Sequence, residues 1–215
     1  MNPFPLILSS PSGGGKTTIT KLLLERRPDV GYSISCTTRA PRNNETNGKD
    51  YFFLSKSDFL EKRERGEFAE SAEVHGNWYG TLRSQVDIVL GQHKHVIMDI
   101  DVQGARQFKA AYTESVLVFL LPPSAEALLQ RLSARQTESG DGFRTRVRAA
   151  REEVRAAVSY QYAVTNDDLE AAYRLVSSII DAEAVKHARQ PQLTARVNAL
   201  VEELDRHLIQ LTTPA

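Results

Sequence analysis

The sequence predicts an α/β fold, with a parallel sheet at its core, an inserted β-rich lobe and a helical lid. Short apolar runs alternate with longer helical patterns along most of the 215 residues. A glycine-rich turn joins the first such run to the first helix. Residues 34–84 are different, because Thr, Asn, Gly, Tyr and Phe are frequent there and turn sequences recur. That composition favours an insertion over another strand–helix unit.

The expected core strands are short and apolar. Residues 6–8 predict a buried first strand, and residues 17–26 predict the helix that follows it. Residues 95–100 and 115–121 are apolar for most of their length, as central strands of a parallel sheet are. A last short strand is expected at Tyr162–Thr165.

The second half of the chain predicts amphipathic helices. Ser124 is a candidate N-cap for a helix that a polar segment at 137–142 should end, and a second helix follows. Two helices joined by a glycine-containing loop make a movable lid. The last helix, at 192–211, has near-heptad apolar spacing. We expect it to pack on its own core, and a self-association surface that makes the protein a homo-oligomer is the alternative.

These elements predict one domain, 1–215. Its expected parts are a core at 1–33, 85–123 and 159–215, a lobe at 34–84 and a lid at 124–158.

Composition excludes several classes of function. Lys plus Arg equals Asp plus Glu at 27 each, so the chain lacks the basic excess of a general nucleic-acid or membrane-surface binder. No apolar run approaches the roughly 18–20 residues of a membrane helix, and no signal peptide is evident. The single cysteine, Cys36, excludes an internal disulfide and agrees with a reducing compartment. We expect a cytoplasmic protein without a nucleic-acid polymer or a membrane as partner.

The strongest motif is Ser10-Pro-Ser-Gly-Gly-Gly-Lys16-Thr17, between an apolar strand and a helix. Such a loop directs backbone N–H groups and a helix N-terminus at phosphates. Lys16 is expected to bridge the β- and γ-phosphates, and Thr17 to bind Mg²⁺. Ser10 replaces the motif's first glycine, so the turn must accommodate a Cβ. The residues expected to cradle the phosphates are Ser12, Gly13, Gly14, Gly15, Lys16, Thr17 and Thr18.

Acidic and basic side chains outside this loop suggest the rest of a site. Asp99 ends an apolar strand, the position from which P-loop enzymes hold Mg²⁺ directly or through water. The alternative is an acid that merely ends a strand. Arg39 and Arg42 flank a proline, and their planar guanidinium groups suit bidentate binding of phosphate. Tyr51 and Tyr79 could donate to the same phosphate. The alternative is that the arginines are two ordinary surface residues and the tyrosines two partly buried ones.

These motifs occur in the order seen in guanylate kinases, and the chain resembles that family over about residues 5–185. The matching segments are the phosphate loop, 37–42, 47–51, 76–80, 99–104, Arg131, Arg135, Arg146 and 166–168. The resemblance implies a P-loop NTPase-type core and ATP-dependent phosphorylation of GMP, and of dGMP, to GDP, with Mg²⁺ accompanying ATP. The stretch at 140–142 departs from the family, which puts the timing of the lid in doubt.

The resemblance also implies roles for acceptor-side residues. Arg39, Arg42, Tyr51 and Tyr79 are similar to the residues that clamp the GMP phosphate. Glu70 resembles the guanine-reading residue, since a carboxylate can accept from both N1–H and the exocyclic amine. Without the family pattern, Glu70 would be taken for a solvated acid at a helix end. Positions near GMP are also implied for Ser35, Thr81 and Asp101.

On the donor side, Arg131 and Asn166 match ATP-binding positions, although an asparagine that forms a turn is the alternative for Asn166. The segment 131–155 holds seven arginines against four acids, a basic excess that the zero net charge hides. By resemblance, Arg135 and Arg146 close over the triphosphate, while the other arginines of the second lid helix are expected to pair with Glu152 and Glu153. The implied catalytic residues are Lys16, Arg39, Asp99, Arg135 and Arg146.

Two other functions compete with this one. A non-catalytic guanylate-kinase-like module would bind a protein through the acceptor lobe, but such modules typically lose the phosphate loop, whose Gly13 to Thr17 are present here. A kinase acting on another acceptor, for instance a sugar phosphate, is the other alternative. Glu70 together with Tyr51 and Tyr79 favours a purine monophosphate.

Overall fold

The computed structural model describes residues 2–42, 44–74, 76–134 and 140–212. Its centre is a five-stranded parallel sheet in the order β2-β7-β1-β8-β9. The strands are β1 (Pro5–Ser9), β2 (Val30–Tyr32), β7 (His95–Asp99), β8 (Val116–Leu121) and β9 (Tyr162–Thr165). The α/β fold and four of these strands are confirmed, whereas β2 was not predicted. It forms because its three residues pair in register with the start of β7.

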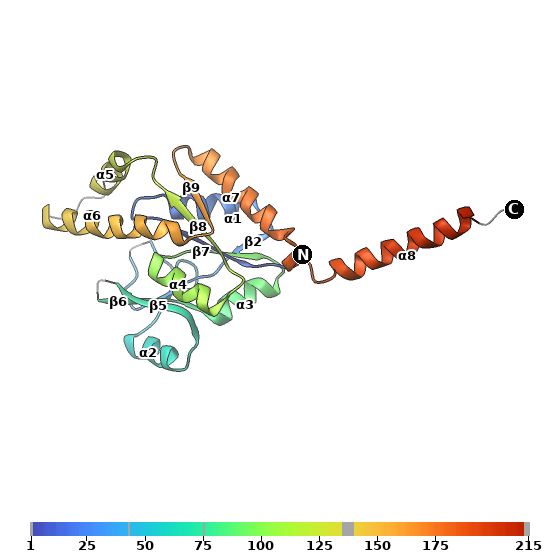
Figure 1. Ribbon diagram of the computed structural model, residues 1–215. Coiled ribbons are helices and arrows are strands. Elements are labelled where there is room, and N and C mark those ends of the chain that lie inside the picture. The colour runs from blue at the N-terminus through green and yellow to red at the C-terminus, as the bar shows by residue number, and fades with distance from the viewer. Residues whose placement is uncertain (1, 43, 75, 135–139, 213–215) are drawn as a thin grey trace.

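Helices cover both faces of this sheet (Figure 1). Alternate residues of β1 point to opposite faces, so Leu6 and Leu8 pack with α1 and α7, and Ile7 packs with α3 and α4. All three side chains are fully buried, as the predicted apolar runs require. The helices are α1 (Lys16–Arg26), α3 (Arg83–Gly91), α4 (Val102–Ala111) and α7 (Leu169–Ala184).

A second, four-stranded sheet in the order β4-β3-β6-β5 confirms the predicted β-rich insertion. Its own small core is aromatic, with the rings of Phe59 and Phe68 stacked at 4.4 Å beside Trp78. Ala69 packs against the main core, which fixes this sheet to the body. The elements are β3 (Cys36–Thr37), β4 (Phe52–Phe53), α2 (Lys56–Glu64), β5 (Phe68–Val74) and β6 (Asn77–Leu82).

The predicted lid is a pair of helices, α5 (Ala125–Ser133) and α6 (Gly140–Arg155), which continues into a 3₁₀ turn, η1 (Ala156–Ser159). Ser124 is the N-cap of α5, since its hydroxyl accepts from the N–H of Ala127 at 3.0 Å. Leu132 and Ala150 join the two helices in a small buried cluster. The expected break at 137–142 is wrong for 140–142, which form the first turn of α6, while 137–139 lie outside the described residues.

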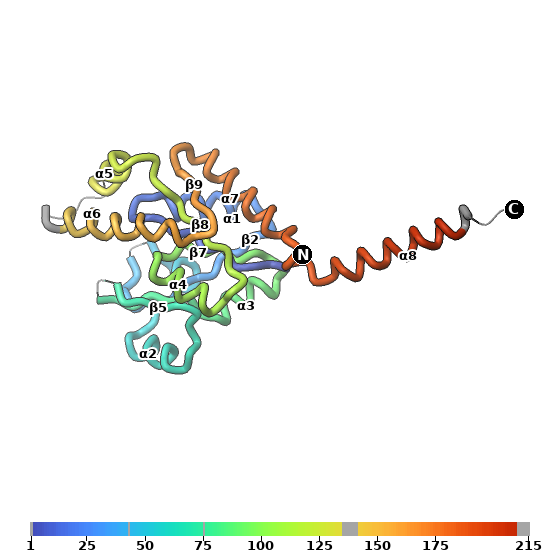
Figure 2. Tube along the Cα trace, viewed as in Figure 1, coloured from blue at the N-terminus to red at the C-terminus, as the bar shows by residue number. Residues whose placement is uncertain are grey.

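The last helix, α8 (Leu193–Thr212), follows a 3₁₀ turn, η2 (His187–Arg189), and extends away from the body beside the N-terminus (Figures 1 and 2). The expectation that it packs on the core is wrong. Val197, Leu200 and Leu204 are 46%, 53% and 63% exposed. Among the described helices, α1 and α7 pack on one face of the central sheet and α3 and α4 on the other, so both faces are already covered without α8.

Within the described ranges, none of these helices combines the length and the apolar character that crossing a membrane requires.

Candidate active site

Two small cavities lie at the carboxyl ends of the central strands, where open parallel sheets place their ligand sites. One, of about 230 Å³, is lined by the phosphate loop from Ser10 to Thr18 and by Glu153. The other, of about 210 Å³, is lined by residues of the second sheet and by the end of β7. Asp99 lines the second cavity and is hydrogen-bonded to Thr17 in the first, so the two cavities are neighbours.

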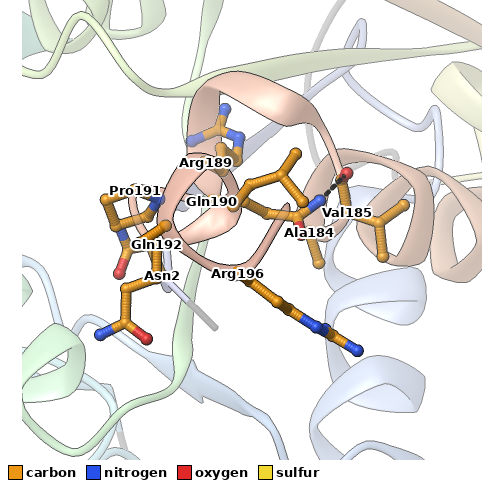
Figure 3. A pocket seen from close by; sticks show the side chains of 10 residues that line it. Asn2, Ala184, Val185, Arg189, Gln190, Pro191, Gln192 and Arg196 are labelled. Carbon is orange, nitrogen blue, oxygen red and sulfur yellow. Dashed lines mark hydrogen bonds between the residues drawn. The ribbon is translucent and has the colours of Figure 1, made fainter. Parts of the chain in front are cut away.

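A larger cavity, of about 670 Å³, lies at the base of α8 rather than at the strand ends. Figure 3 shows Gln190 bonded to the carbonyl of Val185 there, with Arg196 and Asn2 at the rim. None of the predicted site residues lines it. The predicted site residues that line a cavity line the two smaller ones.

The phosphate loop has the backbone that its glycines predict. Gly13 and Gly15 have φ values of 82° and 96°, which other residues rarely adopt. The loop accommodates the side chain of Ser10 because residue 14 is a glycine. A Cβ at position 14 would lie 2.5 Å from Ser10 Oγ. Lys16 Nζ donates to the carbonyl of Ser10 at 2.9 Å, so the lysine folds back over the loop.

Two of the expected ATP-binding residues contact the loop itself. Asn166 is buried, and its amide donates to the carbonyl of Gly14 at 2.9 Å. Arg131 donates to the carbonyl of Asn166 at 3.4 Å. Arg131 also packs closely on Gly13, because a Cβ added to that glycine would lie only 3.2 Å from the Cβ of Arg131. Asn166 and Arg131 thus contact the phosphate loop and stabilise its conformation. Thr17 and Thr18, by contrast, are exposed at the start of α1.

Asp99 is held at both of its carboxylate oxygens. Thr17 Oγ1 donates to Oδ2 at 3.0 Å, and Tyr32 Oη donates to Oδ1 at 2.8 Å. Burial, with a further contribution from Asp99, raises the pKa of Tyr32 far above its ordinary value, so the phenol stays protonated. The sequence predicted Thr17 and Asp99 as a pair but did not single out Tyr32.

The pair Thr17 and Asp99 fits Mg²⁺, because hydroxyl and carboxylate oxygens are the ligands that this cation prefers. In the part of the chain that the structure describes, no three His, Cys, Asp or Glu side chains gather into a metal cage. That agrees with the usual arrangement, in which one or two protein oxygens and the nucleotide phosphates share the ion with water.

Glu70 lies in β5 and lines the second cavity, with its side chain buried. The alternative of a solvated acid at a helix end is therefore wrong. Thr81, fully buried, donates to Glu70 Oε1 at 2.7 Å, and a Cβ at Gly104 would lie 2.9 Å from Oε2. Burial, together with the charge of Asp101, raises the pKa of Glu70 to about 7.

Other predicted acceptor residues surround the same cavity. Ser35, Tyr51 and Tyr79 line it, and the two phenol rings meet edge to face at 6.2 Å. Asp101 lines it too, while its Oδ1 accepts from the N–H of Gly104 at 2.7 Å and caps α4. Residues far apart in the sequence thus converge on one small space.

The two predicted phosphate-binding arginines are placed differently. Arg39 lies over the ring of Tyr51, 5.6 Å from its centroid, and its guanidinium makes two 2.9 Å bonds to Glu45. That ion pair raises the pKa of Arg39. Arg42 is exposed, and its backbone N–H donates to Glu45 at 2.8 Å. Glu45 therefore contacts both Arg39 and Arg42 and fixes the segment between them, although the sequence did not single it out.

Of the lid residues, Glu153 lines the phosphate-loop cavity, whereas the predicted Arg146 lines neither of the two cavities. Arg146 is half-buried, and its Nε and Nη2 atoms are buried without a hydrogen-bond partner among the described residues. Glu153 accepts from the N–H of Ser12 at 3.2 Å, and burial raises its pKa. Glu152 and Glu153 were both expected to pair with arginines. Glu152 does so, since Arg155 donates to it at 3.1 Å. Arg135 lies outside the described residues.

Three contacts of the site were thus missed: Tyr32, Glu45 and Glu153. Glu153 had a signal, since it lies seven residues after Arg146 and so on the same helix face. Tyr32 ends a strand too short to be predicted, and no spacing rule pairs Glu45 with Arg39. The contacts of these two residues come from tertiary structure alone.

Comparison with known proteins gives one consistent result. The family model described as guanylate kinase matches residues 2–183. A guanylate kinase of Nitrosomonas europaea is 44% identical over 86% of this chain and 92% of its own length. A guanylate kinase of Anaeromyxobacter dehalogenans is 48% identical over 85% of this chain and 82% of its own length. The crystal structure of guanylate kinase from Anaplasma phagocytophilum superposes with a TM-score of 0.75 at 33% identity, covering 92% of this chain and 94% of its own.

Proposed function

Because the chain belongs to the guanylate kinase family, we propose that it transfers the γ-phosphoryl group of ATP to GMP or dGMP. The observation that carries this proposal is the pair of neighbouring cavities, one lined by the phosphate loop and the other by a buried carboxylate, Glu70. Asp99 lies between them, bonded to Thr17 on the donor side. This arrangement would bring the phosphate of GMP in line with the terminal phosphate of ATP.

The chemistry needs positioning and charge neutralisation rather than a covalent intermediate. In the proposed reaction an oxygen of the GMP phosphate attacks the γ-phosphorus, and the bond to the β–γ bridging oxygen breaks, leaving ADP. Lys16 would leave Ser10 for the phosphates, and Arg146, with Arg135, would neutralise charge on the transferring group. Thr17 and Asp99 would hold Mg²⁺ directly or through water, and the ion would neutralise further negative charge of the nucleotide phosphates. The GMP phosphate is largely ionised near neutral pH, so no general base is required.

The acceptor would be recognised at two ends. Arg39, Arg42, Tyr51 and Tyr79 would bind its phosphate, which requires Arg39 to exchange part of its ion pair with Glu45 for the ligand. Glu70 would accept from guanine, with Ser35, Thr81 and Asp101 supporting the same region. On the donor side, Ser12 to Thr18, Arg131 and Asn166 would bind ATP.

We also infer the division of labour within the single domain. Residues 34–84 would act as the GMP-binding lobe and 124–158 as the lid, with the remainder as core and the cytoplasm as its location. The phosphate loop, in which Gly13 to Thr17 of the motif are all present, argues against the alternative of a non-catalytic protein-binding module.

A nucleotide panel tests the proposal directly. ADP release is followed with ATP and Mg²⁺ while GMP, dGMP, AMP and UMP are offered in turn. Turnover with GMP and dGMP far above that with AMP or UMP is expected. The absence of turnover with GMP would refute a GMP kinase, and equal turnover with AMP would refute the role of Glu70.

The raised pKa of Glu70 predicts that GMP binds with release of a proton. Guanine offers two donors, so it selects the ionised carboxylate and must lower a pKa that stands at about 7 in the free protein. Affinity for GMP should therefore rise with pH up to about 7, approaching tenfold per pH unit below it. The same raised pKa means that Glu70 makes the folded protein less stable as pH rises from about 4.5 to 7.

Calorimetry of GMP binding in two buffers of different ionisation enthalpy measures this proton. The variant Glu70→Gln serves as the reference, because it retains any contribution from the phosphate of GMP itself. A proton release that persists unchanged in that variant would contradict the prediction.

We further propose that α8 mediates a homodimer by pairing with α8 of a second copy. Val197, Leu200 and Leu204 follow the alternating 3,4 spacing of a two-helix seam and are all exposed. Arg196 lies near the start of the helix, whereas the acids Glu202, Glu203 and Asp205 lie around its middle, followed by Arg206. An antiparallel pair brings these opposite charges together, while a parallel pair would align the acids with each other.

The double variant Leu200→Glu, Leu204→Glu is expected to shift the protein from dimer to monomer in sedimentation velocity. Asn198→Glu adds a charge to the same helix outside the seam and should leave the dimer intact. A wild-type chain that sediments as a monomer at 100 µM would rule out this dimer.

A further inference from the structure

Tyr32 has no part in the reaction described above, yet its hydroxyl lies inside the site. It is the last residue of β2, and Asp99 is the last residue of the neighbouring parallel strand β7. The carboxyl ends of both strands therefore deliver a polar side chain to the same edge of the sheet. The distance from Tyr32 Oη to Asp99 Oδ1 is 2.8 Å, that of a strong hydrogen bond to a carboxylate.

The ring that carries this hydroxyl is anchored in the body. Tyr32 packs against the buried cluster that includes Ile97 and Leu8, between the sheet and α1. A hydroxyl on a packed ring has a fixed position, unlike one on a flexible surface side chain. The hydroxyl that donates to Asp99 is therefore held in position by the packing of the Tyr32 ring against the core.

The two donors to Asp99 divide its oxygens between them. Tyr32 binds Oδ1, and Thr17, the first threonine after Lys16, binds Oδ2 at 3.0 Å. A carboxylate held at both oxygens cannot rotate about its Cβ–Cγ bond without losing a hydrogen bond. Oδ2 is thereby kept toward the phosphate loop, the side on which a metal accompanying the nucleotide would bind.

We propose that Tyr32 is a positioning residue for the magnesium site, whose hydroxyl keeps the Asp99 carboxylate turned toward Thr17. The inference rests on the proposed function insofar as Mg²⁺ accompanies the nucleotide. Groups that orient a metal ligand from the second layer typically change metal affinity or activity by about 10–100-fold when removed. A phenylalanine at position 32 would keep the packing and remove only the hydroxyl.

The test is the affinity for ADP, measured by calorimetry with and without Mg²⁺, in wild type and Tyr32→Phe. We expect the gain in affinity that Mg²⁺ confers to fall about tenfold in the variant, while the affinity for metal-free ADP stays the same. In turnover, the Mg²⁺ concentration that gives half the maximal rate should rise by a similar factor, and KM for GMP should not change.

Tyr162→Phe is the matched control. Its hydroxyl also donates to a carboxylate, Glu183, at 2.7 Å, but at the edge strand β9 rather than at the site. That variant should leave the response to Mg²⁺ unchanged. In an Asp99→Asn background, moreover, Tyr32→Phe should have no further effect on the response to Mg²⁺, because the carboxylate that it orients is gone.

Two results would overturn the inference. One is an unchanged response to Mg²⁺ in a Tyr32→Phe protein that melts at the wild-type temperature. The other is a uniform loss of affinity for ADP with and without metal, together with a lower melting temperature, which would indicate a purely structural residue. Because ADP binding needs no turnover, a wild-type protein that binds Mg²⁺ and ADP but fails to phosphorylate GMP would refute the proposed function and leave this test intact.

Discussion

Replacing Lys16 by methionine is expected to lower kcat about 10³-fold, the largest effect of any single change considered for this chain. The lysine is the loop's only side-chain cation, and its Nζ lies 2.9 Å from the carbonyl of Ser10, within the loop that lines the donor cavity. Removing one preorganised donor from a developing anion typically costs 10²–10³-fold, and charged donors in phosphoryl transfer reach 10³–10⁵. Methionine keeps the length and the apolar stem, so the loop should fold as before.

Steady-state kinetics with saturating GMP measures this loss, and Lys21→Met provides the matched control. Lys21 lies on the same helix, α1, but is exposed and lines neither site cavity. Its replacement should change kcat less than about twofold, as is usual for surface substitutions. A Lys16→Met enzyme that retained a tenth of the wild-type rate would show that the phosphates are neutralised elsewhere.

Replacing Glu70 by glutamine is expected to lower kcat/KM for GMP about 100-fold while KM for ATP stays within about twofold. A bidentate contact to a base edge is worth about 1–3 kcal/mol, and the amide offers a donor where guanine also presents one. The loss should be at the upper end of that range because the site is buried and cannot recruit water easily. Thr81, which donates to Oε1 at 2.7 Å, still finds an acceptor in the amide oxygen, so the fold should be preserved.

Glu73→Gln in the same strand is the control for this variant. Glu73 is exposed and does not line the acceptor cavity. Its replacement should leave both substrates unaffected. If Glu70→Gln weakened ATP and GMP equally, Glu70 would be a structural acid rather than the base-reading group.

The sequence predicted those elements whose pattern is local. The strands β1, β7, β8 and β9 are short runs of mostly apolar residues, and the phosphate loop follows β1 directly, so their identity and order could be derived from the chain alone. β2 could not, because its three residues carry no period, and only the register with β7 makes them a strand.

The last helix shows a different limit. An apolar stripe predicts that a surface is to be covered, but not which surface covers it. On this chain, α7 buries Ala172, Val176 and Ile180 against the sheet, and with α1 it leaves no room on that face for α8. That competition between two amphipathic helices appears only when both are placed in space.

The site divides in the same manner. Lys16 was found from the phosphate-loop motif, Asp99 from its position at the end of an apolar strand, and Glu70 from the family pattern. Their immediate partners Tyr32 and Glu45 were not, since hydrogen bonds made by tertiary approach leave no spacing in the sequence. Partners of this kind decide where a carboxylate or a guanidinium points, which is the part of the site that a motif omits.

The bond from Asn166 to the carbonyl of Gly14 also bears on how the protein is made. It joins positions 152 residues apart, so the phosphate loop receives its final support from nearly the end of the catalytic region. On a ribosome, which releases the chain from its N-terminus, the loop emerges first and must wait for β9 to dock beside β8. A nascent chain that ends before Asn166 therefore lacks this support for its phosphate loop.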